Sequence, residues 1–454
     1  MNSIKLDTGL KKRIFQLSIP IIMQQLFTQL LIWADTAMLG HYDSDLFTAL
    51  GNVITPYELI SSAVYALCGG TTILVAQKIG AKDYNSARKY AECSFLGNSL
   101  FSVIAFSILF FGANFIFDLM GVPDSIVTYT IGYIKIVSFI ILFMGLSGTC
   151  VSILQGVGIT KIIMYSGIFS NLLNILLDWL LIYGIGPFPE LGMEGAAFAT
   201  VISNLSAIPI VLAYVIKSKK IPFKMSLKNT FSVNFKSYKD VLIYGVPSGL
   251  EYMLWNVGVL FMVAFLNHSS DYAAGIYNLV LSIEVFPLMI YMGFSSAGLT
   301  LVGQKTGEKN HDEAIRIGLN CLIYAFVTCI VIGLLFIFAP RPILTLFTDD
   351  ISYVDLSAPY LQFIAIILLP KAINNVVGPS IRGFGDTKWM LYTQVFGTVL
   401  TIACSYVFIM VLNMDVFGAF LTFFFDELIR GVVNYLRFTR GREFFKLKPF
   451  ENKV

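Results

Sequence analysis

The chain has 454 residues, of which 56% are hydrophobic and only 13% are charged, and its formal net charge is +3. Soluble domains usually carry about a quarter charged residues, so this composition cannot cover a globular surface in water. It indicates a protein that lies in a lipid bilayer. The small net charge gives no indication of nucleic-acid binding. The six cysteines lack CxxC spacing and lie in or beside apolar stretches, which is typical of small apolar residues rather than a disulfide or metal framework.

Long apolar stretches recur along the whole chain, and each has the roughly 20 residues that a bilayer-spanning helix needs. They predict twelve helices, at approximately 16–39, 53–76, 92–117, 131–153, 162–184, 194–216, 240–266, 275–302, 316–339, 356–380, 389–411 and 416–437. Alternating patterns are rare, so we expect an all-α membrane protein. The lysine-rich segment 217–239 is predicted to be a cytoplasmic linker between an N-lobe, 1–216, and a C-lobe, 240–454, which includes a cytoplasmic tail.

The basic residues are distributed asymmetrically between the predicted loops. With the N-terminus in the cytoplasm, 27 of the 31 lysines and arginines fall in cytoplasmic segments, whereas Arg341 alone falls in an outer loop. Cytoplasmic loops of membrane proteins carry an excess of such residues, so both termini are predicted to be cytoplasmic. The chain is expected to be a multi-pass protein of the cell's inner (plasma) membrane.

The two halves of the sequence repeat each other. Leu74–Gly80 (LVAQKIG) matches Leu301–Gly307 (LVGQKTG) at an offset of 227 residues. The same offset relates Pro20 to Pro247, Tyr133 to Tyr360, and Gln155–Gly158 to Arg382–Gly385. Six helices per half give both halves the same orientation. We therefore expect a pseudo-twofold axis along the membrane normal, with a cavity between the lobes.

A polar stripe marks the fifth predicted helix. Asn171, Asn174 and Asp178 are spaced by three and four residues, which puts them on one helix face. An ionisable residue in a bilayer costs about 3 kcal/mol or more, so it needs a reason. Carboxylate and amide oxygens suit a Na⁺ or proton site, although a hydrogen-bond network between helices would use the same residues. Asp35 lies near the outer end of the first helix, which Pro20 can kink.

Acidic residues also occur in the predicted helices of the C-lobe. Glu251 follows Pro247 and takes the place of Gln24 in the repeat, and Glu284 lies in a long apolar stretch. Both are candidates for attracting a cation or moving a proton, by the same cost argument. Lys371 is a potential partner for either acid, and such a pair would weaken the interpretation as a cation site.

Other features favour structure over chemistry. Asp426 and Arg430 are four residues apart on a helix, which predicts a local ion pair, and the role of Glu58 is left open. Gly156–Lys161 is better explained as a cytoplasmic turn than as a phosphate loop, and there is no Walker A pattern. No convergent nucleophile and base is visible. The sequence therefore predicts neither an enzyme nor a bound cofactor.

Four motifs accompany the twelve helices and their two repeats: Asp35–Gly40 (DTAMLG) after Pro20, Gln77–Gly80 with its copy, Asn171–Asn174 through Asp178, and Gly192–Ala197 (GMEGAA). With these features the whole chain resembles the multidrug and toxic compound extrusion (MATE) family. The resemblance implies two six-helix lobes around a V-shaped cavity. It also implies Na⁺- or H⁺-driven export of organic cations and other amphipathic drugs by alternating access.

The resemblance assigns site residues as well. Family members with this N-lobe pattern bind the coupling ion at residues that correspond here to Asp35, Asn174, Asp178 and Thr200, so these could hold Na⁺. Second-lobe residues for substrate or coupling correspond to Glu251 and Glu284. Some members have an acid where this chain has Lys371, which places a cation site on that helix in doubt and shifts the expectation to the N-lobe.

We therefore expect a secondary antiporter in which cation or proton entry bends the first helix at Pro20. Its partners would be drug-like small molecules and the lipid bilayer, with no nucleic acid and no obligatory protein partner. A flippase for a lipid-linked substrate is an alternative, although it would favour more helices and a strongly cationic cavity. A membrane-embedded enzyme and a receptor are the alternatives from other classes. The choice between Na⁺ and H⁺, the drug and the oligomeric state are left open.

Overall fold

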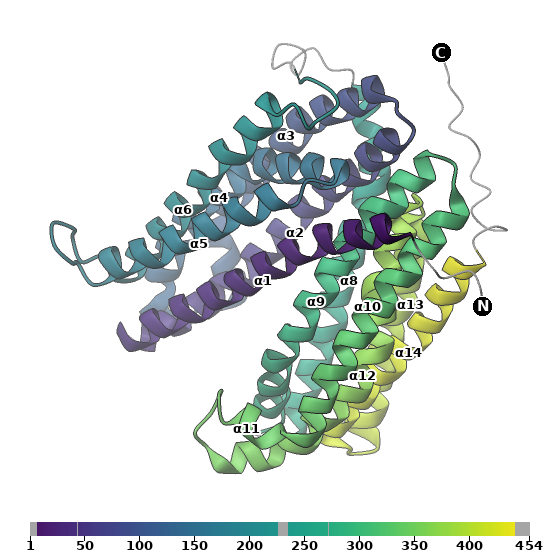
Figure 1. The fold of residues 1–454 in the computed structure, drawn as a ribbon. Helices are drawn as coiled ribbons and strands as arrows, with labels where there is room; N and C mark the ends of the chain where they lie inside the picture. Colours follow the sequence, from purple (N-terminus) through teal and green to yellow (C-terminus); the bar gives the residue numbers. More distant parts are fainter. Residues whose placement is uncertain (1–6, 43, 226–234, 271, 441–454) are drawn as a thin grey trace. The chain divides into compact units, whose positions relative to one another are not determined.

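The computed structural model describes four stretches of the chain: 7–42, 44–225, 235–270 and 272–440. Within them the ordered elements are helices and no strand occurs (Figure 1), as the apolar stretches predicted. Parts of the predicted linker and tail, 226–234 and 441–454, lie outside the described residues. The chain divides into two compact units. The N-terminal unit is Pro20–Gly249, and the C-terminal unit combines Met1–Ile19 with Leu250–Val454.

Two long helices each contribute to both units, α1 (Thr8–Tyr42) and α8 (Phe235–Ser269). The other helices of the N-terminal unit are α2 (Ser44–Gly80), α3 (Tyr84–Met120), α4 (Asp124–Val157), α5 (Lys161–Ile182) and α6 (Gly192–Lys217). Those of the C-terminal unit are α9 (Ala273–Gly307), α10 (His311–Phe338), the short α11 (Pro340–Leu344), α12 (Ile351–Gly383), α13 (Thr387–Ser405) with its π-helical extension η1 (Tyr406–Val411), and α14 (Asp415–Thr439). Most are longer than their predicted apolar stretches, because helical turns continue beyond the apolar residues.

Eleven of the helices in the described part of the chain are long and apolar enough to cross a membrane. The remaining long helix, α14, carries Asp426, Glu427 and Arg430 in its middle, and all three are buried. Its exposed face is apolar instead, with Leu428, Val432 and other large side chains. Charged residues inside and apolar residues outside are expected of a helix in lipid. Its 25 residues are enough to span the hydrocarbon core, so the prediction of twelve helices agrees with the structure.

One central helix organises the core of each unit. In the N-terminal unit α4 packs against α2, α3 and α6, and α5 packs on α6. In the C-terminal unit α12 packs against α9, α10 and α14. The large side chains between these helices are fully buried and include Phe117 in the first unit and Tyr291 and Phe420 in the second.

The predicted repeat is visible in the local geometry of each unit. After α2, Lys82 has a positive φ of 57° and Asp83 caps α3 with its side chain. After α9, Lys309 has a φ of 60° and Asn310 caps α10 in the same way. Each pair is separated by the offset of the sequence motifs. The repeated QK-x-G motif therefore builds the same helix–turn–helix in both halves, and the prediction of a repeat is confirmed.

The two prolines at equivalent positions of the repeat lie close to the points at which α1 and α8 leave one unit and enter the other. Pro20 is buried inside α1 and is the first residue of the N-terminal unit, while Ile19 belongs to the other unit. Pro247 lies inside α8, two residues before the second boundary at Gly249. Proline lacks the backbone N–H and clashes with the preceding turn, so these are the positions where each helix bends most easily.

A glycine allows α3 and α4 to approach closely. A Cβ atom added at Gly145 would lie 2.1 Å from the carbonyl oxygen of Asn98. The backbone N–H of Gly145 also donates to Ser102 Oγ at 2.8 Å. We expect Gly145→Ala to separate the two helices and to cost about 2 kcal/mol or more of stability, as overpacking does. A lower thermal unfolding midpoint of the purified protein would show this.

The control for that substitution is Gly112→Ala. A Cβ at Gly112 meets only the end of the Ile116 side chain, at 3.9 Å. Alanine is the better helix former, so this variant should unfold at the same temperature as the parent or slightly higher. Equal midpoints for the two alanine variants would contradict the close-approach argument.

Candidate functional site

The predicted polar stripe of α5 faces α1. Asn174 and Asp178 are fully buried, and Asn171 is 8% exposed. The Asn171 amide donates to Thr28 Oγ1 on α1 at 3.2 Å. Asp35 and Asp178 each follow these two contacting residues by seven positions, about two helical turns. The carboxyl groups of Asp35 and Asp178 consequently meet and interact directly.

Five polar atoms of this cluster are buried without a hydrogen-bond partner. They are Asp35 Oδ1, both carboxylate oxygens of Asp178, and both amide atoms of Asn174. Two ionised carboxylates cannot hydrogen-bond to each other, because neither has a donor. No basic side chain in the part of the chain that the structure describes forms an ion pair with either acid. A shared proton or a cation would supply what these oxygens lack.

Tyr133 adjoins the acids and links them to Thr200. Tyr133 on α4 is 9% exposed, interacts with both Asp35 and Asp178, and contacts Thr200 on α6. The Thr200 hydroxyl donates to the carbonyl oxygen of Ala196 at 2.8 Å, so the hydroxyl oxygen can still accept a hydrogen bond. Thr200 was expected at the site, whereas Tyr133 was not. In the sequence Tyr133 was visible only as the repeat partner of Tyr360. Such a pairing marks a position shared by both halves and does not indicate a contact with Asp35 or Asp178.

In the C-terminal unit the predicted acids already have basic partners. Arg382 Nη2 at the end of α12 donates to Glu251 Oε1 on α8 at 2.7 Å. Arg382 was interpreted only as part of a repeated turn, although the first half has Gln155 at the same position. Glu251 Oε2 and Arg382 Nε remain buried without a partner, so the contact uses one atom of each group.

Glu284 on α9 is paired with Lys371 on α12. The distance from Lys371 Nζ to Glu284 Oε1 is 2.7 Å, and the two side chains are 13% and 6% exposed. The potential pairing of Lys371 with a C-lobe acid is therefore confirmed, and its partner is Glu284. The Lys371 ammonium group thus occupies the position beside Glu284 that a bound cation would take.

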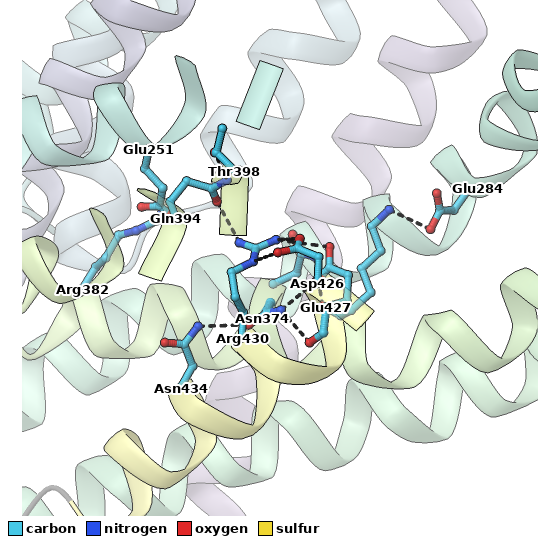
Figure 2. A network of polar contacts seen from close by, with 12 residues as sticks. Glu251, Glu284, Asn374, Arg382, Gln394, Thr398, Asp426, Glu427, Arg430 and Asn434 are labelled. Atoms are coloured by element: carbon cyan, nitrogen blue, oxygen red, sulfur yellow. Dashed lines mark hydrogen bonds and ion pairs between the residues drawn. The ribbon is translucent and has the colours of Figure 1, made fainter. Parts of the chain in front are cut away.

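A buried network surrounds Arg430 on α14. Its Nε donates to Asp426 Oδ1 at 2.8 Å, which confirms the predicted i, i+4 ion pair, and its Nη1 donates to Gln394 Oε1 at 2.7 Å. Glu427 is farther away, at 3.8 Å. Figure 2 shows the guanidinium between these groups, with Glu251 and Arg382 on one side and Glu284 on the other. The network joins α13 to α14 inside the unit.

Amides extend the network along α12 and α14. Asn374 donates to Glu427 Oε2 at 2.6 Å and accepts from Asn434 at 3.0 Å. Trp389 on α13 then donates to Asn434 Oδ1 at 3.0 Å. These partners lie on different helices, 45 to 60 positions apart in sequence, and are not spaced as a motif, so nothing in the sequence pattern identified them.

The sequence profile of the MatE family matches this chain twice, over residues 20–180 and 247–407. The chain belongs to the MATE family. Both matches begin at the paired prolines and differ by the same 227 residues as the motifs, so each half of the chain is one copy of the family unit. MATE proteins are membrane transporters, a family that includes multidrug exporters, and the resemblance seen in the sequence is confirmed.

Relatives from bacteria cover almost the full chain. An uncharacterised transporter, YisQ of Bacillus subtilis, is 27% identical over 95% of this chain and 96% of its own length. A probable multidrug resistance protein, NorM of Thermotoga maritima, is 24% identical over 95% of this chain and 93% of its own length. Each of these relatives therefore matches this chain over 95% of its length.

Solved MATE structures have the same fold. The outward-facing conformation of a multidrug resistance MATE transporter covers 98% of this chain with a TM-score of 0.88 and 20% identity. A transporter of the same superfamily from Pyrococcus furiosus, described as having a binding pocket of reversed polarity that suggests a different function, gives a TM-score of 0.86 at 19% identity. The fold is therefore shared with a protein whose binding pocket is described as reversed in polarity.

Proposed function

We propose that this MATE protein is a Na⁺- or H⁺-coupled antiporter that exports organic cations and other amphipathic drugs by alternating access. The observation that carries the proposal is the facing pair Asp35 and Asp178. Both acids are held against each other in the membrane-spanning part of the N-terminal unit, and their buried oxygens lack donors. Such a pair favours the uptake of one positive charge at a time.

The oxygen ligands of this cluster suit either Na⁺ or a proton. The side chains of Asp35, Asn174, Asp178 and Thr200 each offer oxygen, the ligand atom that hard cations prefer. A proton would instead bridge the two carboxyl groups and supply the missing donor. In both cases the added charge relieves the repulsion between Asp35 and Asp178. The chain needs no resident cofactor for this step.

The drug movement is coupled to the ion through α1. Asp35 and Pro20 lie on the same helix, and Pro20 is where α1 passes from one unit to the other. Neutralising Asp35 changes how strongly the outer part of α1 is held against α5. A change in that contact bends the helix at Pro20, because the backbone there lacks one hydrogen bond. This links the charge on Asp35 to the orientation of α1.

Drug-like small molecules are the substrates that the names of the relatives favour, since NorM of Thermotoga maritima is described as a probable multidrug resistance protein. The plasma membrane, with both termini in the cytoplasm, is the location that the basic residues favour. Export from that location requires only the lipid bilayer and an ion gradient, with no protein partner.

Transport in proteoliposomes tests the proposal. The purified protein is reconstituted, and ethidium movement is recorded under an imposed Na⁺ gradient, an imposed pH gradient, or neither. We expect one of the gradients to drive ethidium against its concentration gradient and the Asp178→Asn variant to abolish that response. Ethidium movement that ignores both gradients would contradict the proposal.

A further inference from the structure

The Lys371 ammonium lies in surroundings that suit a cationic ligand. Its Nζ atom is 2.7 Å from Glu284 Oε1 and 5.7 Å from the centroid of the Phe423 ring. A carboxylate combined with an aromatic face is how proteins bind organic ammonium groups, and the attraction is strongest where water is excluded. Glu284 is almost fully buried. The C-terminal unit therefore contains the elements of an ammonium site, occupied by its own lysine.

The wall of this site is aromatic. Tyr277 on α9 is fully buried, and its ring stacks on Phe423 with centroids 6.1 Å apart and planes 9° apart. The Tyr277 hydroxyl interacts with Glu284 and has no hydrogen-bond partner. Phe423 also borders a small cavity that it shares with Trp255 and Asp426. A buried hydroxyl without a partner beside a carboxylate is costly unless a ligand uses it.

The charges around Lys371 are not balanced. Four membrane-embedded carboxylates of this unit, those of Glu251, Glu284, Asp426 and Glu427, face three bases, Lys371, Arg382 and Arg430. Glu427 has the weakest contact with a base, at 3.8 Å from Arg430. Lys371 also interacts with Glu427 over a longer range. The lysine thus interacts with both carboxylates, and the four acids exceed the three bases by one negative charge.

We propose that an organic ammonium ligand binds to Glu284, Phe423 and Tyr277 in place of Lys371, whose side chain then moves to Glu427. Lys371 acts as an internal competitor that must leave before the ligand enters. This lowers the apparent affinity by the fraction of molecules in which the site is free. The ligand is a transported drug only if the proposed function holds, whereas binding itself depends on neither an ion gradient nor transport.

Binding of ethidium to the purified protein in detergent, followed by fluorescence anisotropy, tests the proposal. Lys371→Met removes the competitor at similar length and should tighten binding about tenfold. Lys371→Arg keeps a tethered cation and should leave the affinity near that of the parent. Adding Glu284→Gln to Lys371→Met should remove the gain, because the ligand loses its carboxylate.

Two outcomes would overturn the proposal: equal affinity in the Lys371→Met variant and the parent, or a gain that survives Glu284→Gln. If Lys371→Met does not yield folded protein, Glu284→Gln in the parent decides, with about tenfold weaker binding expected and unchanged binding overturning the proposal. Glu308→Gln is the matched control, since this carboxylate is 39% exposed and pairs with Lys305 away from the site. A chain that binds in this pattern but ignores both gradients would contradict the proposed function alone.

Discussion

Ethidium export driven by an ion gradient is expected to fall about 100-fold in the Asp178→Asn variant. The amide keeps the size of the side chain and removes the charge that attracts the ion. The variant leaves the coupling ion one carboxylate instead of two, and a loss of about 3 kcal/mol in the free energy of ion binding corresponds to about 100-fold in an equilibrium constant. Initial rates of gradient-driven ethidium transport in proteoliposomes, at equal protein content, provide the measurement.

The partner acid gives a second arm to this experiment. Asp35→Asn should cause a similar loss, and the double variant should be little worse than either single one, because the two carboxyl groups act as a unit. Asp118→Asn is the control, as Asp118 is an exposed carboxylate at the end of α3 in the same unit. Coupling that survives in Asp178→Asn, or that is lost equally in Asp118→Asn, would argue against a site at Asp35 and Asp178.

Arg430→Met is expected to cause the largest loss of stability, about 3–5 kcal/mol. Methionine fills much of the space but leaves Asp426 without its ion pair and Gln394 without its donor. Each would then be a buried polar group in a bilayer, where water cannot replace the lost partner. The thermal unfolding midpoint of the purified protein, with and without added lipid, measures the effect.

Arg341→Met is the control for this substitution. Arg341 pairs with Asp355 at 3.0 Å, but the two side chains are 68% and 50% exposed. Exposed ion pairs contribute about 1 kcal/mol or less, so this variant should unfold close to the parent. Similar midpoints for the two methionine variants would show that the Arg430 network contributes little to stability.

Local sequence patterns predicted much of the fold and part of the candidate site. Apolar stretches depend only on length and composition, so they suffice to place the helices along the chain. The repeat is recognised from the order of residues along the chain alone. The family matches at 20–180 and 247–407 are separated by the same 227 residues as the repeated motifs. The α5 stripe and the pair Asp426 and Arg430 follow from helical spacing alone. These features need no knowledge of which helices become neighbours.

The sequence by itself determined a twelve-helix MATE transporter with Asp35 and Asp178 as candidate ion ligands. Only the tertiary structure decided that these carboxyl groups meet, that Tyr133 joins them, and that Glu284 is held by Lys371. The reason is physical: residues on different helices meet according to packing and helix rotation, which depend on all the side chains between the helices. The acids that the repeat does not conserve between the two halves were the candidate site residues. Helix packing then determined the partner of each charged side chain.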